Sequence, residues 1–266
     1  MADAADALRG KGANSVALPK SKRVEKLLLI PDVHVPFEDK KAVALVLRMA
    51  AKVKFDRVVT LGDTLDFQAV SFHAKTLGKR PGFAKEVKAG NELLDKIDAL
   101  GIPHKHFLAG NHEYRFDRYL AEKAPELSDL PGMNVQELLR LKERGWTYTP
   151  YKSELRIGKL WLTHDEGNAG PLAAIKARNT YSGNVAIGHC HAATVSYEGN
   201  ARGESHVGIS CGWLGSVKNV DYLHQVKARR WQHAVGVGLV DTNGHVHLGV
   251  SAIVKGKIAV FGEIYS

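Results

Sequence analysis

The sequence has few cysteines and no long apolar run. Its 266 residues include 2 cysteines, Cys190 and Cys211, too few for a disulfide framework and consistent with a reducing cytoplasm. No apolar stretch approaches the roughly 18 residues that a membrane-spanning helix needs. The start of the chain also lacks the basic and apolar regions of a secretory signal peptide. We therefore expect a soluble cytoplasmic protein with no membrane partner.

The chain has enough apolar residues for one sizeable core. Hydrophobic residues make up 44% of it, and no linker-like stretch divides it, so we predict a single domain over residues 25–266. Residues 1–24 are small, polar and basic and are interrupted by Gly10, Gly12 and Pro19. This composition predicts a mobile basic arm. The sequence leaves the oligomeric state open.

Five short clusters of polar residues stand out. They are Asp32-Val33-His34, Gly62-Asp63-Thr64-Leu65-Asp66, Gly110-Asn111-His112-Glu113, Thr163-His164-Asp165 and Gly188-His189-Cys190-His191. Each follows a run of β-forming apolar residues, as the second follows Val58-Val59-Thr60-Leu61. Because the carboxyl ends of buried strands meet at one rim of a sheet, we expect a single site there. Gly62, Gly110 and Gly188 suit sharp turns and close backbone approach.

The spacing of the acidic residues and histidines predicts metal coordination. Asp32 and His34 alternate along what reads as an extended segment, so both can chelate one ion. Asp63 has two carboxylate oxygens and can bridge two cations roughly 3.5 to 4 Å apart. His189 and His191 also alternate, but at a turn they can face different ions.

The remaining donors are neutral or imidazole groups. Asn111 offers a carbonyl oxygen and His164 a ring nitrogen, while Cys190 is expected to point away as a packed thiol, like Cys211. A carboxylate, amide and imidazole set without thiolate suits manganese, iron, zinc or nickel better than a structural zinc site. The other histidines are read as surface or satisfied core residues: His104, His106, His206, His224, His233, His245 and His247.

In this order the clusters resemble the calcineurin-type metallophosphoesterase superfamily. Its blocks are Asp-x-His, Gly-Asp-x-x-Asp, Gly-Asn-His-Glu/Asp, His and Gly-His-x-His, and all occur between residues 32 and 191. The resemblance assigns Asp32, His34 and His191 to one metal ion, Asn111, His164 and His189 to the other, and Asp63 to both. It also implies that His112 contacts the substrate phosphate or the leaving-group oxygen. Asp66 is then expected to orient His112 through its ring N–H.

The pattern of elements agrees with the fold that this resemblance implies. The expected fold class is α/β, a four-layer α/β/β/α sandwich of two mixed β-sheets flanked by helices. Helical spacing predicts helices over Lys40 to Val53, Lys85 to Leu100 and Glu113 to Ala121. The third would place its amino terminus beside the phosphate site. Strands are predicted at Val235 to Val240, Val246 to Val254 and Ile258 to Tyr265.

The predicted activity is metal-dependent hydrolysis of a phosphoric ester. The expected cofactors are two divalent transition-metal ions, manganese first, with iron, zinc or nickel as alternatives. They would activate a bridging hydroxide for in-line attack on phosphorus, while His112 donates a proton or a hydrogen bond to the leaving oxygen.

The substrate is predicted less directly. Protein phosphatases of the superfamily usually continue the second block with Asp-Arg-Gly, whereas Phe67 and Gln68 follow Asp66, so that arginine clamp for a phosphate dianion is missing. The residues after the third block resemble small metallophosphoesterases common in bacteriophage genomes, which suggests a phage protein made in the host cytoplasm. Arg115 and Arg118 are candidate replacements for the clamp, although both also suit an exposed helix face.

A net charge of +9 favours a polyanionic substrate, although charge runs are commonly solvated surface. The loop from Phe67 to Pro81 is the best candidate for a substrate-facing insertion, with His73, Lys79 and Arg80 as candidate contacts.

The leading interpretation is a phosphodiesterase or nucleotide phosphohydrolase whose partner is a nucleotide or nucleic acid. The alternatives are a phosphomonoesterase acting on small metabolites or phosphoproteins, and a non-catalytic scaffold, against which the complete ligand set argues.

Overall fold

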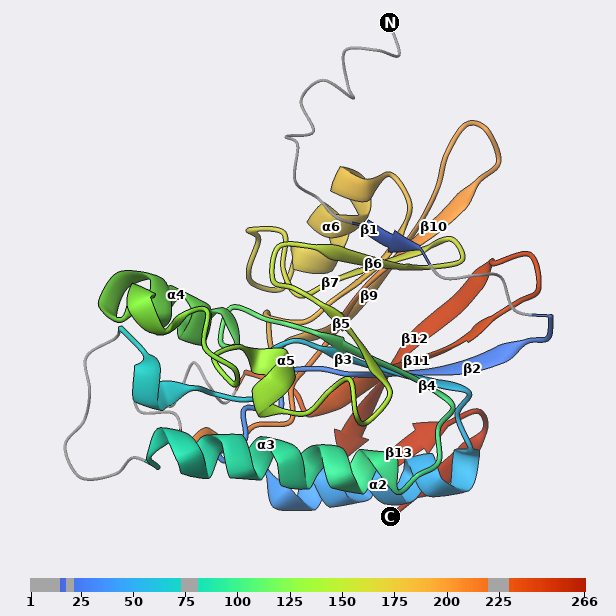
Figure 1. Cartoon of the computed structure of the whole chain (residues 1–266). Helices are drawn as coiled ribbons and strands as arrows, with labels where there is room; N and C mark the ends of the chain where they lie inside the picture. Colours follow the sequence, from blue (N-terminus) through green and yellow to red (C-terminus); the bar gives the residue numbers. More distant parts are fainter. Residues whose placement is uncertain (1–14, 18–21, 73–80, 220–229) are drawn as a thin grey trace, which may run out of the picture.

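Two mixed β-sheets form the centre of the protein (Figure 1). The computed structural model describes residues 15–17, 22–72, 81–219 and 230–266. The eight-stranded sheet has the order β14-β13-β12-β11-β2-β3-β4-β5. Its strands are β2 (Glu25–Ile30), β3 (Arg57–Leu61), β4 (His104–Leu108), β5 (Trp146–Thr149), β11 (Ala234–Val240), β12 (Val246–Val254), β13 (Lys257–Val260) and β14 (Glu263–Tyr265). Strands β2 to β5 pair in parallel, and β11 to β14 add antiparallel pairs.

The six-stranded sheet has the order β1-β6-β7-β8-β10-β9. Its strands are β1 (Ser15–Ala17), β6 (Glu154–Ile157), β7 (Leu160–Thr163), β8 (Asn184–Ile187), β9 (Ala193–Gly199) and β10 (Ser205–Cys211). The pairs β7–β8 and β8–β10 are parallel, whereas β6–β7 and β9–β10 are antiparallel. Early strands therefore alternate with helices and later strands form hairpins, as the sequence predicts.

Helices cover the outer faces of both sheets. Figure 1 shows α2 (Lys40–Val53) and α3 (Phe83–Asp98) side by side under the eight-stranded sheet and α6 (Ala173–Tyr181) over the six-stranded one. One hydrophobic core lies between the two sheets and includes Leu27 and Leu29. A second core, which includes Leu28, lies between the eight-stranded sheet and the helices α2 and α3. A third cluster packs α6 on its sheet. The four-layer α/β/β/α prediction is confirmed.

The helix predicted over residues 40–53 is confirmed at both ends. The Asp39 side chain accepts hydrogen bonds from the backbone N–H groups of Lys41 and Ala42, at 2.9 and 3.0 Å, which caps the first turn. Lys54 ends the helix in the left-handed conformation. The helix predicted over residues 85–100 begins earlier, at Phe83, and ends at Asp98.

Two predictions of local structure need correction. The strand expected over residues 258–265 is a hairpin of β13 and β14, because Phe261 and Gly262 both have positive φ and reverse the chain. Within the predicted mobile arm, Ser15–Ala17 form β1, which pairs in parallel with β6. Residues 1–14 and 18–21 lie outside the described residues, so the arm as a whole stays a prediction.

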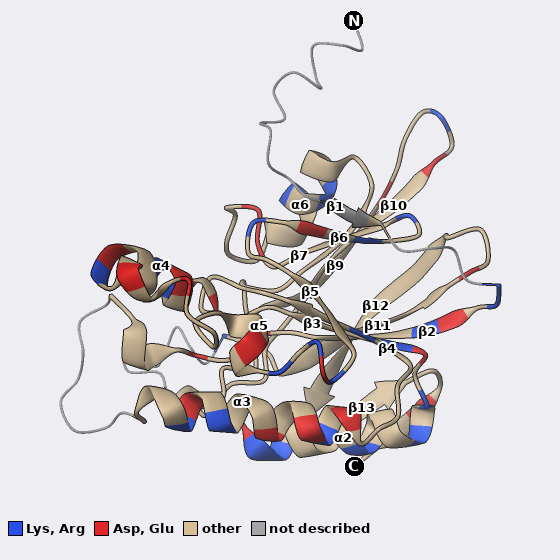
Figure 2. Cartoon of the chain, in the orientation of Figure 1, with Lys and Arg blue, Asp and Glu red and all other residues tan. Residues whose placement is uncertain are grey.

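The outer helices α3 and α4 (Tyr114–Lys123) carry charges of both signs (Figure 2). Lys88 pairs with Glu92 on α3, and Arg118 pairs with Glu122 on α4. Such pairs are typical of a solvated helix surface. Among the described residues, no helix combines the length and apolar character needed to cross a membrane.

Candidate metal centre

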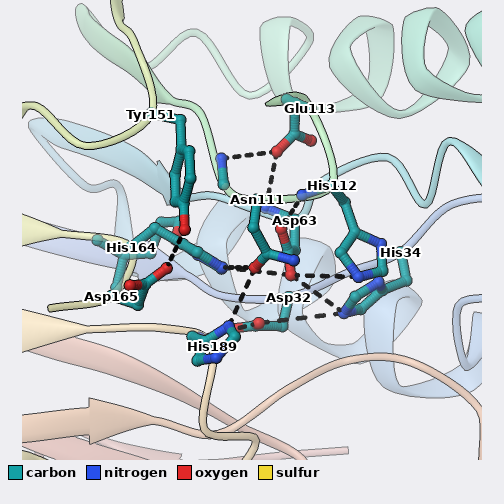
Figure 3. Close-up of polar contacts among 12 residues, drawn as sticks. Asp32, His34, Asp63, Asn111, His112, Glu113, Tyr151, His164, Asp165 and His189 are labelled. Atoms are coloured by element: carbon teal, nitrogen blue, oxygen red, sulfur yellow. Dashed lines mark hydrogen bonds and ion pairs between the residues drawn. The ribbon is translucent and has the colours of Figure 1, made fainter. Parts of the chain in front are cut away.

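The polar clusters meet at one end of the sandwich, where strands of both sheets end. Asp32 follows β2, Asp63 follows β3 and Asn111 follows β4 in the eight-stranded sheet, whereas His164 follows β7 and His189 follows β8 in the six-stranded one. Figure 3 shows these side chains converging. The expectation of a rim on a single sheet is therefore corrected: the two packed sheets share the site.

The backbone at the site is left-handed at several predicted ligands. Asp32, His34, Asp63, His189 and His191 have φ values of 41°, 53°, 50°, 63° and 55°. The extended geometry predicted for the Asp32-x-His34 pair is therefore wrong. Non-glycine residues rarely adopt this conformation, and such strain concentrates at functional sites. Hydrogen bonds between loops hold it, including one from the His34 N–H to the Asp63 carbonyl at 2.9 Å.

Glycines allow the loops to approach the ligands closely. A Cβ atom on Gly110 would lie 2.2 Å from Asp63 Oδ1, and one on Gly188 would lie 2.8 Å from Asp32 Oδ2. Any side chain at either position would displace a buried carboxylate. The expected close approach is confirmed, and the group approached is a predicted ligand.

Asp32, His34 and His191 form the first ligand group. His191 Nε2 lies 3.3 Å from Asp32 Oδ1 and 3.2 Å from His34 Nε2. All three side chains are buried. Their donor atoms therefore face one another at separations that suit a shared cation.

Asn111, His164 and His189 form the second group. Asn111 Oδ1 lies 2.9 Å from His164 Nε2 and 3.0 Å from His189 Nδ1. Asp63 lies between the two groups, with Oδ2 3.2 Å from His164 Nε2 and 3.9 Å from His34 Nε2. The predicted ligands are thus brought together, in the grouping and with the intermediate Asp63 that the resemblance implies.

The donor chemistry of the second group fits a bound cation. His164 Nδ1 lies 2.7 Å from the Leu61 carbonyl and donates to it, so the neutral ring carries a lone pair on Nε2. In that neutral form the lone pair faces the oxygens of Asn111 and Asp63, and three lone pairs repel unless a metal ion or a proton lies among them. Although burial lowers the pKa of His164, the Asp63 carboxylate raises it to about 10, so in the absence of a metal ion a proton on Nε2 supplies the positive charge between these oxygens.

The carboxylates of the first group and of the shared Asp63 also need a positive charge close by. Asp32 and Asp63 are almost fully buried, and within the described residues both carboxylates form ion pairs with histidines. Buried carboxylates need positive charge nearby. A set of oxygen and imidazole donors without thiolate fits divalent transition-metal ions.

His112, Asp66 and Arg115 form a polar group beside Asp63. His112 Nδ1 donates to the Asp66 carbonyl at 2.9 Å, and His112 Nε2 lies 3.7 Å from Asp63 Oδ2. The pKa of His112 is lowered, because the effect of burial outweighs the opposing effect of the Asp63 and Asp66 carboxylates. The Asp66 carboxylate also lies 3.2 Å from His34 Nδ1. Asp66 therefore contacts both a predicted ligand and the predicted catalytic histidine.

The structure separates the candidate substrate contacts. Arg115 donates to the Asp66 carbonyl at 2.8 Å and to His112 Nε2 at 2.8 Å, so it belongs to the site. Arg118 pairs with Glu122 and lies over the Phe72 ring at 3.9 Å from its centroid. These are surface contacts of α4. His73, Lys79 and Arg80 lie outside the described residues and stay predictions.

Glu113 is a site residue whose role the sequence reading missed. Its fully buried carboxylate accepts hydrogen bonds from the N–H groups of Asp63 at 2.9 Å, Leu65 at 2.9 Å and Gly110 at 2.7 Å. It therefore joins the loops after β3 and β4, as Figure 3 shows. The only sequence signal for this role is its place in the third block, just before α4.

The cysteine prediction is confirmed. Cys190 and Cys211 are free and buried. Burial raises the pKa of the Cys190 thiol to about 12. Its Sγ contacts the Asn168 carbonyl at 3.6 Å, away from the ligands on either side of it in sequence. His106 is a buried core residue whose Nε2 accepts from Arg57 at 2.7 Å, but its Nδ1 is buried without a hydrogen-bond partner among the described residues, so the expected satisfied core position is only half met.

Comparison with known proteins gives one family match and two phage relatives. The calcineurin-like phosphoesterase family model matches residues 25–249. The gene 54 protein of Mycobacterium phage D29 is 26% identical over 257 residues, which cover 91% of this chain and 98% of that protein. The gene 54 protein of Mycobacterium phage L5 is 26% identical over 259 residues with the same coverage.

Solved structures resemble the fold more distantly. Vacuolar protein sorting 29 from Cryptosporidium parvum has 16% identity and a TM-score of 0.47, covering 92% of this chain and 99% of that one. The phosphoesterase Yfce from E. coli has 16% identity and a TM-score of 0.40, covering 84% of this chain and 97% of that one.

Proposed function

Because the chain belongs to the calcineurin-like phosphoesterase family, we propose that it is a two-metal phosphoester hydrolase acting on phosphodiesters or nucleotides derived from nucleic acid. The position of Asp63 carries this proposal. Its Oδ2 lies 3.2 Å from a nitrogen of one ligand group and 3.9 Å from a nitrogen of the other, as a bridging carboxylate requires. The phage origin of the gene 54 relatives supports a phage protein acting in the host cytoplasm.

The ligand groups assign the metal positions. Asp32, His34 and His191 would hold one ion, Asn111, His164 and His189 the other, and Asp63 both. Two such ions, when bound, polarise phosphoryl oxygens and lower the pKa of water so that hydroxide is available near neutral pH. We propose Mn²⁺ as the native ion because the donors are carboxylate, amide and imidazole.

His112 would stabilise the leaving oxygen. Its Nδ1 proton is held by the Asp66 carbonyl, so Nε2 is the atom directed at the reacting group. In the structure Arg115 donates to that Nε2 at 2.8 Å. When a phosphoryl oxygen displaces Nε2 from the Arg115 guanidinium, the Nε2 lone pair would be free to take up a proton from water and to give that proton to the leaving oxygen. Asp66 is the positioning residue for both His112 and Arg115.

The surroundings of Phe67 favour a diester. Phe67 is fully buried and stacks on Phe83 with ring centroids 5.4 Å apart, so the segment after Asp66 presents an apolar side chain to the core. The site therefore has no guanidinium at that position to neutralise a dianion. The position of the Arg115 guanidinium beside His112 favours the alternative, a phosphomonoesterase, because it could bind a terminal phosphoryl oxygen.

Two chromogenic substrates test the proposal. We expect the Mn²⁺-loaded protein to hydrolyse bis(p-nitrophenyl) phosphate with a kcat/KM at least equal to that for p-nitrophenyl phosphate. Arg115→Ala should lower the monoester rate more than the diester rate, with Lys123→Ala on the exposed end of α4 as the matched control. A strong monoester preference would favour the phosphomonoesterase, and bound metal without hydrolysis of either substrate would favour a non-catalytic scaffold.

A further inference from the structure

An aromatic pair lies beside the second ligand group. Tyr114, the first residue of α4, and Tyr151, in the turn between β5 and β6, have ring centroids 5.4 Å apart. The Tyr151 ring lies 6.3 Å from that of His164, and its hydroxyl donates to Asp165 at 2.9 Å, as Figure 3 shows. Tyr114 is 41% exposed. An aromatic surface open to solvent thus adjoins one predicted metal position.

A lysine accompanies this pair. Lys152 Nζ lies 6.0 Å from the Tyr114 ring centroid and 5.8 Å from that of Tyr151. Lys152 is exposed and has a φ of 64°, a left-handed conformation that glycine adopts more easily. The two tyrosine rings are tilted by 37° to each other, and a cation beside accessible aromatic rings is the combination that binds a base and its neighbouring phosphate.

A second aromatic residue lies beside the first ligand group. The Trp231 ring meets that of His191 edge-on at a centroid distance of 4.2 Å and packs against Trp213 at 4.8 Å. Trp213 is buried, whereas Trp231 is partly exposed and follows the exposed Arg230. Each ligand group thus contacts an accessible aromatic residue that has a basic neighbour.

We propose that the substrate is a single-stranded nucleic acid that crosses both metal positions. The base on one side of the scissile phosphodiester would stack on Tyr114 and Tyr151, and a base on the other side on Trp231. Lys152 and Arg230 would contact the flanking phosphates. The proposed hydrolysis leaves these aromatic residues without a role, and a small monoester could engage only one of the two positions. This inference rests on the proposed function, because it assigns the two sides of its reacting phosphate.

Strand binding tests the inference separately from catalysis. The probe is a fluorescein-labelled strand of ten thymidines with phosphorothioate linkages that slow cleavage, followed by fluorescence anisotropy with Mn²⁺-loaded protein. A matched strand has the same backbone without bases. We expect the wild type to bind the thymidine strand about tenfold or more tightly than the abasic strand, because stacking on one aromatic side chain is of this size.

Variants then locate the stacking positions. Tyr114→Ala and Trp231→Ala should each weaken thymidine-strand binding by about tenfold and reduce the preference over the abasic strand, whereas Tyr114→Phe and Trp231→Phe should restore it. Tyr119→Ala, an exposed tyrosine on the same helix, should bind like the wild type. Equal wild-type affinity for both strands, or Ala variants that keep the preference, would overturn the inference. If the wild-type protein loaded with Mn²⁺ does not hydrolyse bis(p-nitrophenyl) phosphate, the proposed function itself is overturned.

Discussion

The carboxylate of Glu113 accepts the backbone N–H of Asp63 at 2.9 Å. The same oxygen accepts the Gly110 N–H at 2.7 Å, and the other accepts the Leu65 N–H. This one buried side chain thus fixes the loop that carries the proposed bridging ligand.

Replacement of Glu113 should therefore loosen metal binding. Glu113→Gln removes one acceptor from a buried set of N–H donors, and we expect Mn²⁺ affinity to fall about tenfold to a hundredfold, as for other supporting residues of metal sites. Glu113→Ala leaves buried donors unpaired, each costing about 1–3 kcal/mol of folding free energy. Metal titration and thermal unfolding measure both effects. Glu122→Gln, at an exposed position of α4, is the control, and unchanged affinity in Glu113→Gln would refute the role.

Substitution of His112 should separate catalysis from metal binding. His112→Gln should keep both ions and lower kcat about a hundredfold to ten-thousandfold, because the ring is assigned to the leaving oxygen. Metal analysis with steady-state kinetics provides the readout. His112 Nε2 also lies near Asp63 Oδ2 and His34, so loss of an ion in the variant would make His112 a ligand and contradict this assignment.

Glu86 should make stability depend on pH. This buried α3 residue accepts the backbone N–H groups of Gln68 and Ala69, and burial raises its pKa to about 7 from 4.5. The folded state holds this proton more tightly than the unfolded state, so the stabilising contribution is complete below pH 4.5 and is lost as pH rises through about 7.

Glu86→Gln should abolish that loss. We expect the variant to gain up to about 3 kcal/mol relative to the wild type at pH 8, and little at pH 5. Urea unfolding at the two pH values measures the difference. Glu92→Gln, exposed on α3, should show no such pH dependence, and an equal effect of Glu86→Gln at both pH values would disprove the titration.

The predicted substrate-facing loop from Phe67 to Pro81, which also contains Lys75, should contribute only to the binding of long substrates. If the substrate is a nucleic acid, apparent affinity should fall with salt by roughly one logarithmic unit per phosphate contact for each tenfold increase. Neutralising Lys75, Lys79 and Arg80 together should flatten that slope and leave bis(p-nitrophenyl) phosphate hydrolysis nearly unchanged. Equal losses on both substrates would mean that the loop shapes the site itself.

The residue types and their order predicted much of the site. Buried apolar runs such as Leu27 to Ile30 indicated strands, and the ligands after them were expected to converge. Strand periodicity could not predict the left-handed backbone of Asp32 and His34, because hydrogen bonds to the loop after β3 impose it.

Other features depend on contacts between distant segments. Nothing near Glu113 in the sequence reveals that it would accept N–H groups from a loop about fifty residues away. The division of the ligands between two sheets likewise follows from strand pairing, which local patterns leave open. The hairpin at Phe261 was not predicted, because only Gly262 and Glu263 interrupt the apolar residues between positions 258 and 265.

Asp63 provides the most direct test of the two-metal account. Metal content by mass spectrometry and hydrolysis of bis(p-nitrophenyl) phosphate should be measured together for the wild type and Asp63→Ala, each supplied with Mn²⁺. The account predicts close to two ions per chain in the wild type, and in Asp63→Ala the loss of both activity and most of the bound metal. Asp63→Ala with two ions and the wild-type rate would contradict it.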